Sequence, residues 1–229
     1  MKGNDSCQVD LLVMPPNNSF INGDCLEYMK ICPDKHFDLA IVDPPYGNVA
    51  VFCNCQPLER KNKREQKYRY KDWDASPPPP EYFEELFRVS KNQVIWGGNY
   101  FDLPISRGWV YWDKNNGENN FSDGELGWTS FNKRLMSVKK NSKAETRGGR
   151  DRFHPTQKPV YLYRWILHNY AAAGDLILDT HVGSASSLIA CTELGFDYIG
   201  FEIDKEYYEM AKSRLGRATR KYELEFEAV

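Results

Sequence analysis

The chain has 229 residues, of which 41% are hydrophobic and 27% are charged, an ordinary composition for a soluble globular protein. This length predicts one domain with a sizeable core, and no apolar run approaches the roughly 20 residues of a membrane helix. Six scattered cysteines and an N-terminus without an apolar signal segment favour the cytoplasm. Cys53 and Cys55 are half of a zinc site at most, because two further ligands at convincing spacing are missing, and we expect no metal.

The net charge of −2 argues at first against a nucleic-acid partner, but the charge is unevenly spread. Residues 59–71 carry a net +5 and residues 133–152 a net +6, which leaves −13 for the rest of the chain. Affinity for phosphate follows local rather than total charge, so these two segments are candidates for nucleic-acid contacts. Charge alone is equally compatible with two solvated loops.

The first clear element is an apolar run at residues 37–42, which predicts a strand that ends at an aspartate. A polyproline run at 77–80 precedes a helix-like segment, residues 81–89, whose apolar side chains fall at helical spacing and belong to a core rather than a site. Further strands are expected at 93–96 and 109–112, followed by Gly and Asp. Strands that give way to loops at Asp or Gly are typical of α/β sheets, whose ligands gather at the carboxyl ends of the strands.

The last third of the chain is the clearest unit. A strand at 176–178, a helix at 187–194, a strand at 198–202 and a helix at 205–215 follow one another. Because this is a βαβα unit, the sheet here should be parallel. The predicted fold class is therefore α/β with a doubly wound, mostly parallel sheet.

A glycine- and serine-containing turn from Asp179 to Ser186 joins the first strand of this unit to its helix. Glycine lets the backbone approach a ligand closely, and Glu202 ends the next strand, where it can accept the hydroxyls of a ribose. These features predict an adenosine-containing ligand. A dinucleotide is disfavoured because the second and third glycines of the G-x-G-x-x-G pattern are missing. A generic nucleotide site and a plain tight turn stay open as alternatives.

Asp43-Pro44-Pro45-Tyr46 follows the strand at 37–42. Two successive prolines fix φ and donate no hydrogen bonds, so the turn offers carbonyl oxygens and the Asp43 carboxylate as acceptors. A planar substrate that carries an NH₂ group fits such acceptors, with the Tyr46 ring stacked on its face. By itself the Asp-Pro-Pro tripeptide is only a turn signal; the adenosine site downstream gives it chemical meaning.

Asp43 to Tyr46 resembles the catalytic signature of the amino-group DNA methyltransferases, Asp179 to Ser186 resembles their S-adenosylmethionine loop, and the His154-Pro-Thr-Gln-Lys-Pro segment resembles the motif that precedes this loop. The order of the motifs is that of the beta group, and the resemblance covers roughly residues 20–215. It implies a methyltransferase fold of the Rossmann-like type over residues 1–229, with target-recognition insertions at 47–75 and 115–153. The compact size favours a phage or orphan enzyme in a bacterial or phage-infected cell.

The resemblance also implies roles for individual residues. The catalytic motif comprises Asp43, Pro44, Pro45 and Tyr46. The implied cofactor-binding residues are Asp24, Cys25, Asp43, Thr156, Lys158, Asp179, Thr180, His181, Gly183, Ser184, Glu202 and Ile203. Thr156 and Lys158 would hold the methionine end of the cofactor and Glu202 its ribose.

Segments 96–100 and 125–128 resemble those that line the base pocket of the family, which implies Tyr46, Trp96, Asn99 and Trp128 as pocket residues. For Trp128 a place in the core is an equal alternative. The expected contacts with double-stranded DNA come from the basic segments and comprise Arg60, Lys61, Lys63, Arg64, Lys67, Lys133, Arg134, Lys139, Lys140, Arg147 and Arg150. A homodimer is left open, and no membrane partner is expected.

The cofactor loop departs from the usual Asp-x-Phe-x-Gly-Ser-Gly at two positions. His181 replaces the Phe, where we expect it to cover the cofactor rather than move a proton. Ala185 replaces the second Gly, and we expect it to require a negative φ where glycine was unrestricted.

The chemistry implied is a direct in-line methyl transfer. Hydrogen bonds from the amino group to Asp43 and to the Pro44 carbonyl would localise the nitrogen lone pair. The base must be flipped out of the duplex, with Tyr46 replacing the lost stacking. In the family, Asp at the first motif position tends to accompany adenine and Ser cytosine, so adenine N6 is the predicted target. The alternatives are cytosine N4, an RNA amino group, and an inactive DNA-binding relative.

Overall fold

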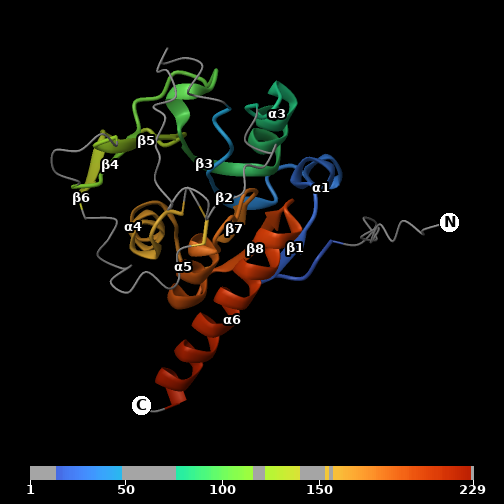
Figure 1. Cartoon of the computed structure of the whole chain (residues 1–229). Coiled ribbons are helices and arrows are strands. Elements are labelled where there is room, and N and C mark those ends of the chain that lie inside the picture. Colours follow the sequence, from blue (N-terminus) through green and yellow to red (C-terminus); the bar gives the residue numbers. More distant parts are fainter. Residues whose placement is uncertain (1–13, 48–75, 116–121, 140–152, 155–156, 228–229) are drawn as a thin grey trace, which may run out of the picture.

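The structure is a computed structural model that describes residues 14–47, 76–115, 122–139, 153–154 and 157–227. In this part of the chain, one eight-stranded sheet lies between two layers of helices (Figure 1). The architecture is the α/β class with a mostly parallel sheet that the sequence predicts.

The order of the strands in the sheet is β1-β8-β7-β2-β3-β5-β4-β6. The strands are β1 (Ser19–Asn22), β2 (Phe37–Val42), β3 (Ser90–Trp96), β4 (Trp109–Asp113), β5 (Gly124–Thr129), β6 (Met136–Lys139), β7 (Leu176–Asp179) and β8 (Asp197–Glu202). The five strands from β1 to β3 in that order are parallel, β5 is antiparallel to both of its neighbours, and β6 is parallel to β4.

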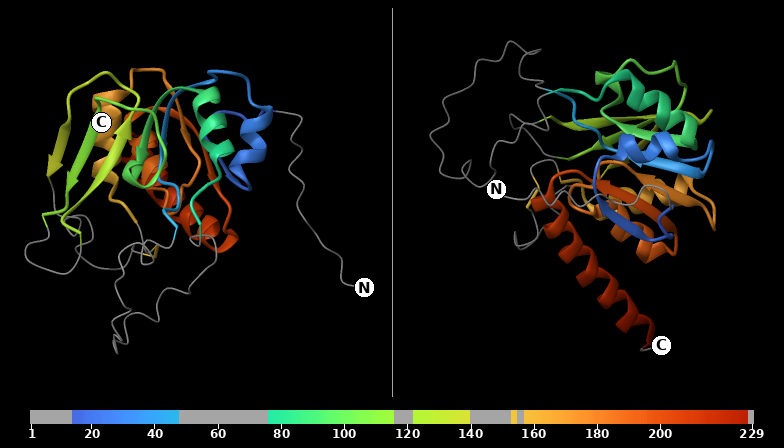
Figure 2. Two further views of the ribbon diagram at one scale, coloured as in Figure 1. Left: turned by 90° about the horizontal axis from the view of Figure 1, so that it is seen from above. Right: turned by 90° about the vertical axis from the view of Figure 1, so that its right-hand side faces the viewer.

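Helices cover both faces of the sheet. They are α1 (Cys25–Ile31), α3 (Pro80–Val89), α4 (Val160–Tyr170), α5 (Ser186–Leu194) and α6 (Lys205–Glu227), with a 3₁₀ turn, η3 (Gly98–Tyr100). One layer holds α1 and α3, and the other holds α4, α5 and α6. The C-terminal part of α6 projects away from the rest of the molecule (Figures 1 and 2). The sequence places the end of the last helix at residue 215, but α6 continues to 227. Gly216 in a helix interior costs only about 1 kcal/mol, which good helix formers around it offset.

Strand β2 shows why the central strands are continuously apolar. Side chains alternate between the faces of a sheet, so Leu39 and Ile41 pack into the core under α4 and α5, while Ala40 and Val42 pack into the core under α1 and α3. A strand buried on both faces lacks the alternation of polar and apolar residues that a half-exposed strand shows.

The carboxyl ends of the parallel strands share one edge of the sheet, here called the catalytic edge. The register pairs Asn22 at the end of β1 with Glu202 at the end of β8, and Val42 at the end of β2 with Ile95 of β3. Asp179 ends the strand between β8 and β2. The sequence motifs that follow these strands therefore meet at the catalytic edge.

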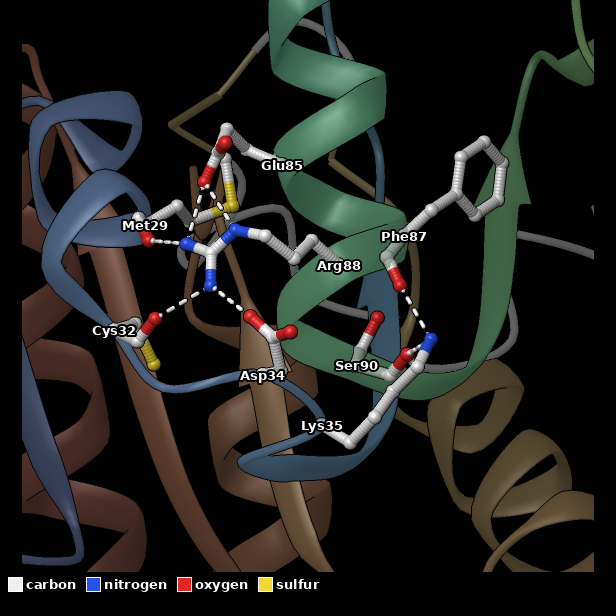
Figure 3. Close-up of polar contacts among 8 residues, drawn as sticks. All are labelled: Met29, Cys32, Asp34, Lys35, Glu85, Phe87, Arg88 and Ser90. Atoms are coloured by element: carbon white, nitrogen blue, oxygen red, sulfur yellow. Dashed lines mark hydrogen bonds and ion pairs between the residues drawn. The ribbon is translucent and has the colours of Figure 1, made fainter.

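Two basic side chains, those of Arg88 and Lys35, connect α1, α3 and the segment that follows α1. The guanidinium of Arg88 on α3 lies at the C-terminal end of α1, where the last carbonyls of a helix lack partners (Figure 3). It donates at 2.5 to 2.7 Å to the carbonyls of Met29 and Cys32 and the carboxylates of Asp34 and Glu85. Lys35 likewise donates to the carbonyl of Phe87 at 2.6 Å and to that of Ser90 at 3.0 Å, at the end of α3. These contacts hold the C-terminal end of α3 against α1, at the edge of the sheet opposite the catalytic edge.

Candidate active site

The carboxylate of Asp43 stands directly after β2 and has a partner on each oxygen. The hydroxyl of Tyr46 donates to Oδ1 at 2.6 Å, and the ammonium of Lys158 donates to Oδ2. Only 15% of the Asp43 side chain is exposed. Burial raises the pKa of Asp43 above its ordinary value, although Lys158 opposes the rise. The group predicted to accept the amino hydrogens is thus a buried carboxylate whose charge depends on a cation beside it.

Lys158 lies between two carboxylates. Its side chain is 3% exposed, and besides Asp43 it contacts Oε2 of Glu125 at 3.0 Å and the hydroxyl of Tyr46 at 3.4 Å. Burial lowers the pKa of the ammonium, but the two carboxylates outweigh burial and hold the pKa above its usual range. The resemblance implies that Lys158 holds the methionine end of a cofactor, and this role stays a prediction; in the structure its ammonium contacts the carboxylate of Asp43.

Glu125 of β5 begins segment 125–128, which the resemblance implies for the base pocket, but Glu125 itself is not among the implied site residues. Its Oε1 contacts the ammonium of Lys114 at 2.6 Å, and its Oε2 contacts Lys158. Although burial raises the pKa of Glu125, these two cations outweigh it, and the pKa lies below its ordinary value. The signal that was available is a glutamate inside a strand, which is uncommon, but only the antiparallel pairing of β3 with β5 brings it to the site.

The ring of Tyr46 lies against the backbone of Gly97. This glycine has φ +66°, and a Cβ built on it would overlap the Tyr46 ring, so both the conformation and the close approach require glycine. On the ring itself, Tyr100 is stacked at 5.0 Å between centroids, with 22° between the planes. Tyr100 is 47% exposed. The ring of Tyr46, which is expected to stack on the base, therefore already has an exposed aromatic ring stacked on it.

The three other residues implied for the base pocket have different environments. Trp96 is fully buried, and its ring lies 5.4 Å from the Lys158 ammonium. Trp128 is 4% exposed and donates its indole N–H to the carbonyl of Pro104 at 2.8 Å, which favours a place in the core. Asn99 in η3 is exposed beside the catalytic edge. Of these three side chains, Asn99 is the one that solvent reaches.

The loop after β7 is braced by Asp179. Its Oδ1 accepts from the backbone N–H of His181 at 3.0 Å, and its Oδ2 accepts from the hydroxyl of Ser187 on α5. Burial raises the pKa of Asp179 to about 7. The carboxylate holds the loop and the first turn of α5 in place.

Glu202 joins the same loop to β8. Its Oε2 accepts from the backbone N–H of Gly183 at 2.9 Å, and its Oε1 accepts from that of Asp204 at 2.9 Å. Gly183 has φ +53° and lies under the ring of His154, whose atoms would be 3.5 Å from a Cβ at this position. The structure therefore brings His154, the loop from Asp179 to Ser186 and Glu202 together.

The expectation for Ala185 is wrong. This residue has φ +62° and ψ 22°, a left-handed conformation, in the position where the family has glycine. It is fully buried, and its carbonyl accepts from Ile189 of α5, so the turn and the helix impose the glycine-like conformation on alanine. Arg214 of α6 supports the turn by donating to the carbonyl of Ser184 at 2.6 Å.

Thr180 and His181 form a small cluster with α3. The hydroxyl of Thr180 lies 2.6 Å from the hydroxyl of Tyr82 and 2.9 Å from Nδ1 of His181. Burial lowers the pKa of His181 to about 4, so the ring is neutral at physiological pH, as a residue that replaces Phe should be. Tyr82, which the sequence assigns to the core, is buried as predicted but also contacts the loop through its hydroxyl.

The segment after β1 lies beside the end of β8. Asn22 donates through its side chain to the carbonyl of Glu202 at 2.7 Å. Asp24 is the N-cap of α1 and accepts from Leu26, so its carboxylate is exposed but engaged. Cys25 is buried, and Ile203 is 62% exposed. The cofactor-binding residues implied around Asp24 and Glu202 are thus neighbours in space.

The implied DNA contacts are only partly within the described residues. Arg60, Lys61, Lys63, Arg64, Lys67, Lys140, Arg147 and Arg150, like Thr156 of the cofactor set and the Cys53–Cys55 pair, lie outside them. Lys139 is exposed and ends β6 at the catalytic edge, where it pairs with Asp113. Lys133 and Arg134 lie at the opposite edge, and the Lys133 ammonium donates to the carbonyl of Asn169 at 2.6 Å. The structure does not bring these two residues to the site.

Within the described ranges, no group of three or more His, Cys, Asp or Glu side chains is arranged to hold a metal ion. No helix in the same part of the chain has the length and apolar character needed to cross a membrane.

Comparison with known proteins places this arrangement in a family. A model of the N6/N4 methyltransferase family, described as DNA methylase, matches residues 57–213. The type II methyltransferase M2.MboI of Moraxella bovis is 32% identical over 155 residues, which cover 68% of this chain and 52% of that protein. M.HinfI of Haemophilus influenzae is 26% identical over 249 residues, which cover 86% of this chain and 68% of that protein. The chain thus spans about half the length of M2.MboI.

Solved structures share the fold. The complex of M1.HpyAVI with S-adenosylmethionine matches with a TM-score of 0.52 at 21% identity, over 85% of this chain and 98% of that one. The cytosine-N4-specific PvuII DNA methyltransferase matches with a TM-score of 0.55 at 17% identity, over 91% and 92%. Because the family model covers well over half of the residues, the chain belongs to the N6/N4 DNA methylase family.

Proposed function

We propose that the protein transfers a methyl group from S-adenosylmethionine to the N6 amino group of adenine in DNA, with the base flipped out of the duplex. The observation that carries this proposal is the buried Asp43 carboxylate, which lies at the same edge of the sheet as the loop held by Glu202. This arrangement supports an acceptor for an amino group beside a site for an adenosine.

The residues present fit an adenosine cofactor with a sulfonium group. Gly183 leaves the loop without a side chain at its positive φ, and Glu202 supplies a carboxylate at the end of β8, which suits a ribose diol. The ring of His181 is neutral and adds no positive charge near a sulfonium. When bound, the cofactor would supply an electrophilic methyl group and leave as S-adenosylhomocysteine, and the methylated nitrogen would lose its extra proton to solvent. The presence of S-adenosylmethionine in the M1.HpyAVI structure supports the same assignment here.

The chemistry required of the chain is acceptance of hydrogen bonds. The lone pair of an aromatic amino nitrogen is delocalised into the ring, and acceptors on its two hydrogens localise that pair. Asp43 and the Pro44 carbonyl take this role, and Tyr46 stacks on the base, with the cofactor site at the adjacent strand ends. The Tyr46 hydroxyl occupies Asp43 Oδ1, so binding of the amino group exchanges or shares this contact.

Adenine is favoured over cytosine by one residue. In the family, Asp at the position of Asp43 tends to accompany adenine, and Ser cytosine. The fold does not separate the two, because the PvuII enzyme, which shares it, is specific for cytosine N4. Methylation of cytosine N4 is therefore the second candidate. We assign double-stranded DNA as the substrate, contacted through segments 47–75 and 115–153.

The test uses labelled S-adenosylmethionine and DNA that lacks methylated bases. After incubation, the DNA is digested to nucleosides and the labelled nucleoside is identified. The proposal predicts that the label is found in N6-methyl-2′-deoxyadenosine. Label in N4-methylcytosine would move the assignment to the second candidate, and unlabelled DNA would remove the proposed function.

A further inference from the structure

Four charged side chains form a row that ends at the carboxylate of Asp43, here called the charge row: Lys114, Glu125, Lys158 and Asp43. Adjacent members are in contact, at 2.6 Å between Lys114 and Glu125 and at 3.0 Å between Glu125 and Lys158, and Lys158 donates to Asp43. The signs alternate, so the row is neutral as a whole. Side-chain exposure is 18% at Lys114, 25% at Glu125, 3% at Lys158 and 15% at Asp43, so Lys158 is the most buried member of the row.

The two contacts of Lys158 differ in kind. Its contact with Asp43 is a hydrogen bond, whereas Oε2 of Glu125 is buried and has no hydrogen-bond partner among the described residues. Glu125, at 3.0 Å, attracts the ammonium chiefly by charge, through a contact that is less well aligned than the one to Asp43. An attraction of this kind has no strong directional preference, so the position of Lys158 between the carboxylates can respond to a change at either one.

The proposed chemistry sets two opposing requirements on Asp43. The carboxylate must be ionised to accept a hydrogen bond, and burial alone opposes ionisation. The carboxylate must also keep a lone pair available for the amino group. A cation that bound only Asp43 would engage that lone pair. A lysine shared between two carboxylates meets both requirements, because it supplies positive charge without belonging wholly to Asp43.

We propose that Glu125 is a positioning residue for methyl transfer that acts through Lys158: it draws the ammonium partly away from Asp43, so that the carboxylate, which Lys158 keeps ionised, can still accept the amino group. This inference rests on the proposed function and names a further residue for the same site. Glu125 itself makes no contact with the base in this account.

Several groups affect the ionisation of Asp43. They are Lys158, Glu125, Tyr46, Tyr163 of α4, Tyr82 of α3 and Asp179 of β7. Burial raises the pKa of Asp43, Lys158 lowers it and Glu125 raises it. When the charge of Glu125 is removed, Asp43 is the only carboxylate of the row that still contacts the Lys158 ammonium, so the pKa of Asp43 should fall. Removing the charge of Lys114 leaves Glu125 with Lys158 as its remaining cation in the row, which should draw Lys158 from Asp43 and raise the pKa.

The test compares Glu125→Gln with Lys114→Gln in the full chain, and Glu193→Gln is the matched control. Glu193 pairs at 2.5 Å with Arg164 on the surface of α4 and α5, away from the charge row. Two readouts are taken: the pH profile of methyl transfer and the titration of the Asp43 carboxyl carbon by NMR in the free protein. Ionised Asp43 is required, so its pKa sets the acid limb, below which activity is lost.

We expect Glu125→Gln to move the acid limb and the NMR titration to lower pH, and to reduce kcat on the order of tenfold at pH 7.5 with unchanged cofactor affinity. Lys114→Gln should move both to higher pH, and Glu193→Gln should change neither. Equal reductions of kcat with no movement of the limb, or movement of both variants in one direction, would overturn the inference. The NMR titration needs no turnover, so opposite shifts in a protein that methylates no DNA would refute the proposed function and leave the charge row standing.

Discussion

The phenol ring of Tyr46 lies against the backbone of Gly97, so closely that a Cβ at Gly97 would overlap the ring. Gly97 is also the left-handed residue that ends β3 and begins η3. One glycine thus sets both the turn and the place of the ring that should stack on a flipped base. This contact can be tested separately from backbone strain.

We expect Gly97→Ala to reduce kcat on the order of 100-fold, because the methyl group displaces Tyr46 from its position beside Asp43. Gly174→Ala is the control: Gly174 has φ +86°, but a Cβ there would meet nothing within 4 Å. Both variants should lose about 1 kcal/mol of stability from the left-handed alanine. Steady-state kinetics beside urea unfolding separates the two effects. Equal loss of activity in both variants would show that strain, and not the ring contact, matters.

Ala185 should behave as a strained residue. Ala185→Gly removes a buried methyl group but relieves the positive φ of 62°, so we expect little change in the free energy of unfolding. Ala190, equally buried within α5, has ordinary helical surroundings, and Ala190→Gly should cost about 2 kcal/mol more. Urea unfolding of both variants measures the difference. A cost at Ala185 that matches the cost at Ala190 would contradict the left-handed conformation.

His181 should not affect cofactor binding through its charge above pH 5. Its pKa in the folded protein is lowered to about 4, so the ring gains a proton only as the pH falls through that value. Cofactor affinity of the wild type and of His181→Phe should therefore run parallel from pH 5 to pH 8, as measured by calorimetry. A wild-type affinity that falls from pH 7 to pH 5 while that of the variant stays constant would mean that His181 ionises near 6.5 beside the sulfonium.

The sequence predicts the site best where the chemistry is local. Asp43, Tyr46 and the loop from Asp179 follow strands that the hydrophobic pattern reveals, and parallel strands bring their carboxyl ends to one edge. Glu202 is found for the same reason.

The site residues that the sequence did not predict depend on pairing between distant segments. Glu125 reaches Lys158 because β5 pairs antiparallel with β3, which no local pattern indicates. Tyr82 was assigned to the core because its helical spacing says nothing of where its hydroxyl ends. The expectation for Ala185 was wrong because preference for negative φ is a local rule, and here the packed turn overrides it.

Salt dependence tests the DNA contacts. Replacing Arg60, Lys61, Lys63, Arg64 and Lys67 with Gln should flatten the dependence of DNA affinity on salt, by about 0.9 in log–log slope for each phosphate that the variant no longer neutralises. Lys91→Gln is the control, because Lys91 is exposed near the start of β3, at the edge of the sheet opposite the site, and lies outside both segments. Fluorescence anisotropy over a range of salt concentrations measures the slopes. If the variant with all five substitutions keeps the wild-type slope, residues 60–67 are a solvated segment that does not contact DNA.

Asp43 should accept the amino group during methyl transfer, and Asp43→Ala removes this acceptor. The variant is incubated with labelled S-adenosylmethionine and DNA, the labelled nucleosides are counted, and cofactor affinity is measured by calorimetry on the same sample. The account predicts no labelled methyladenine above background, with cofactor binding still measurable. Turnover within about tenfold of the wild type would contradict the role of Asp43.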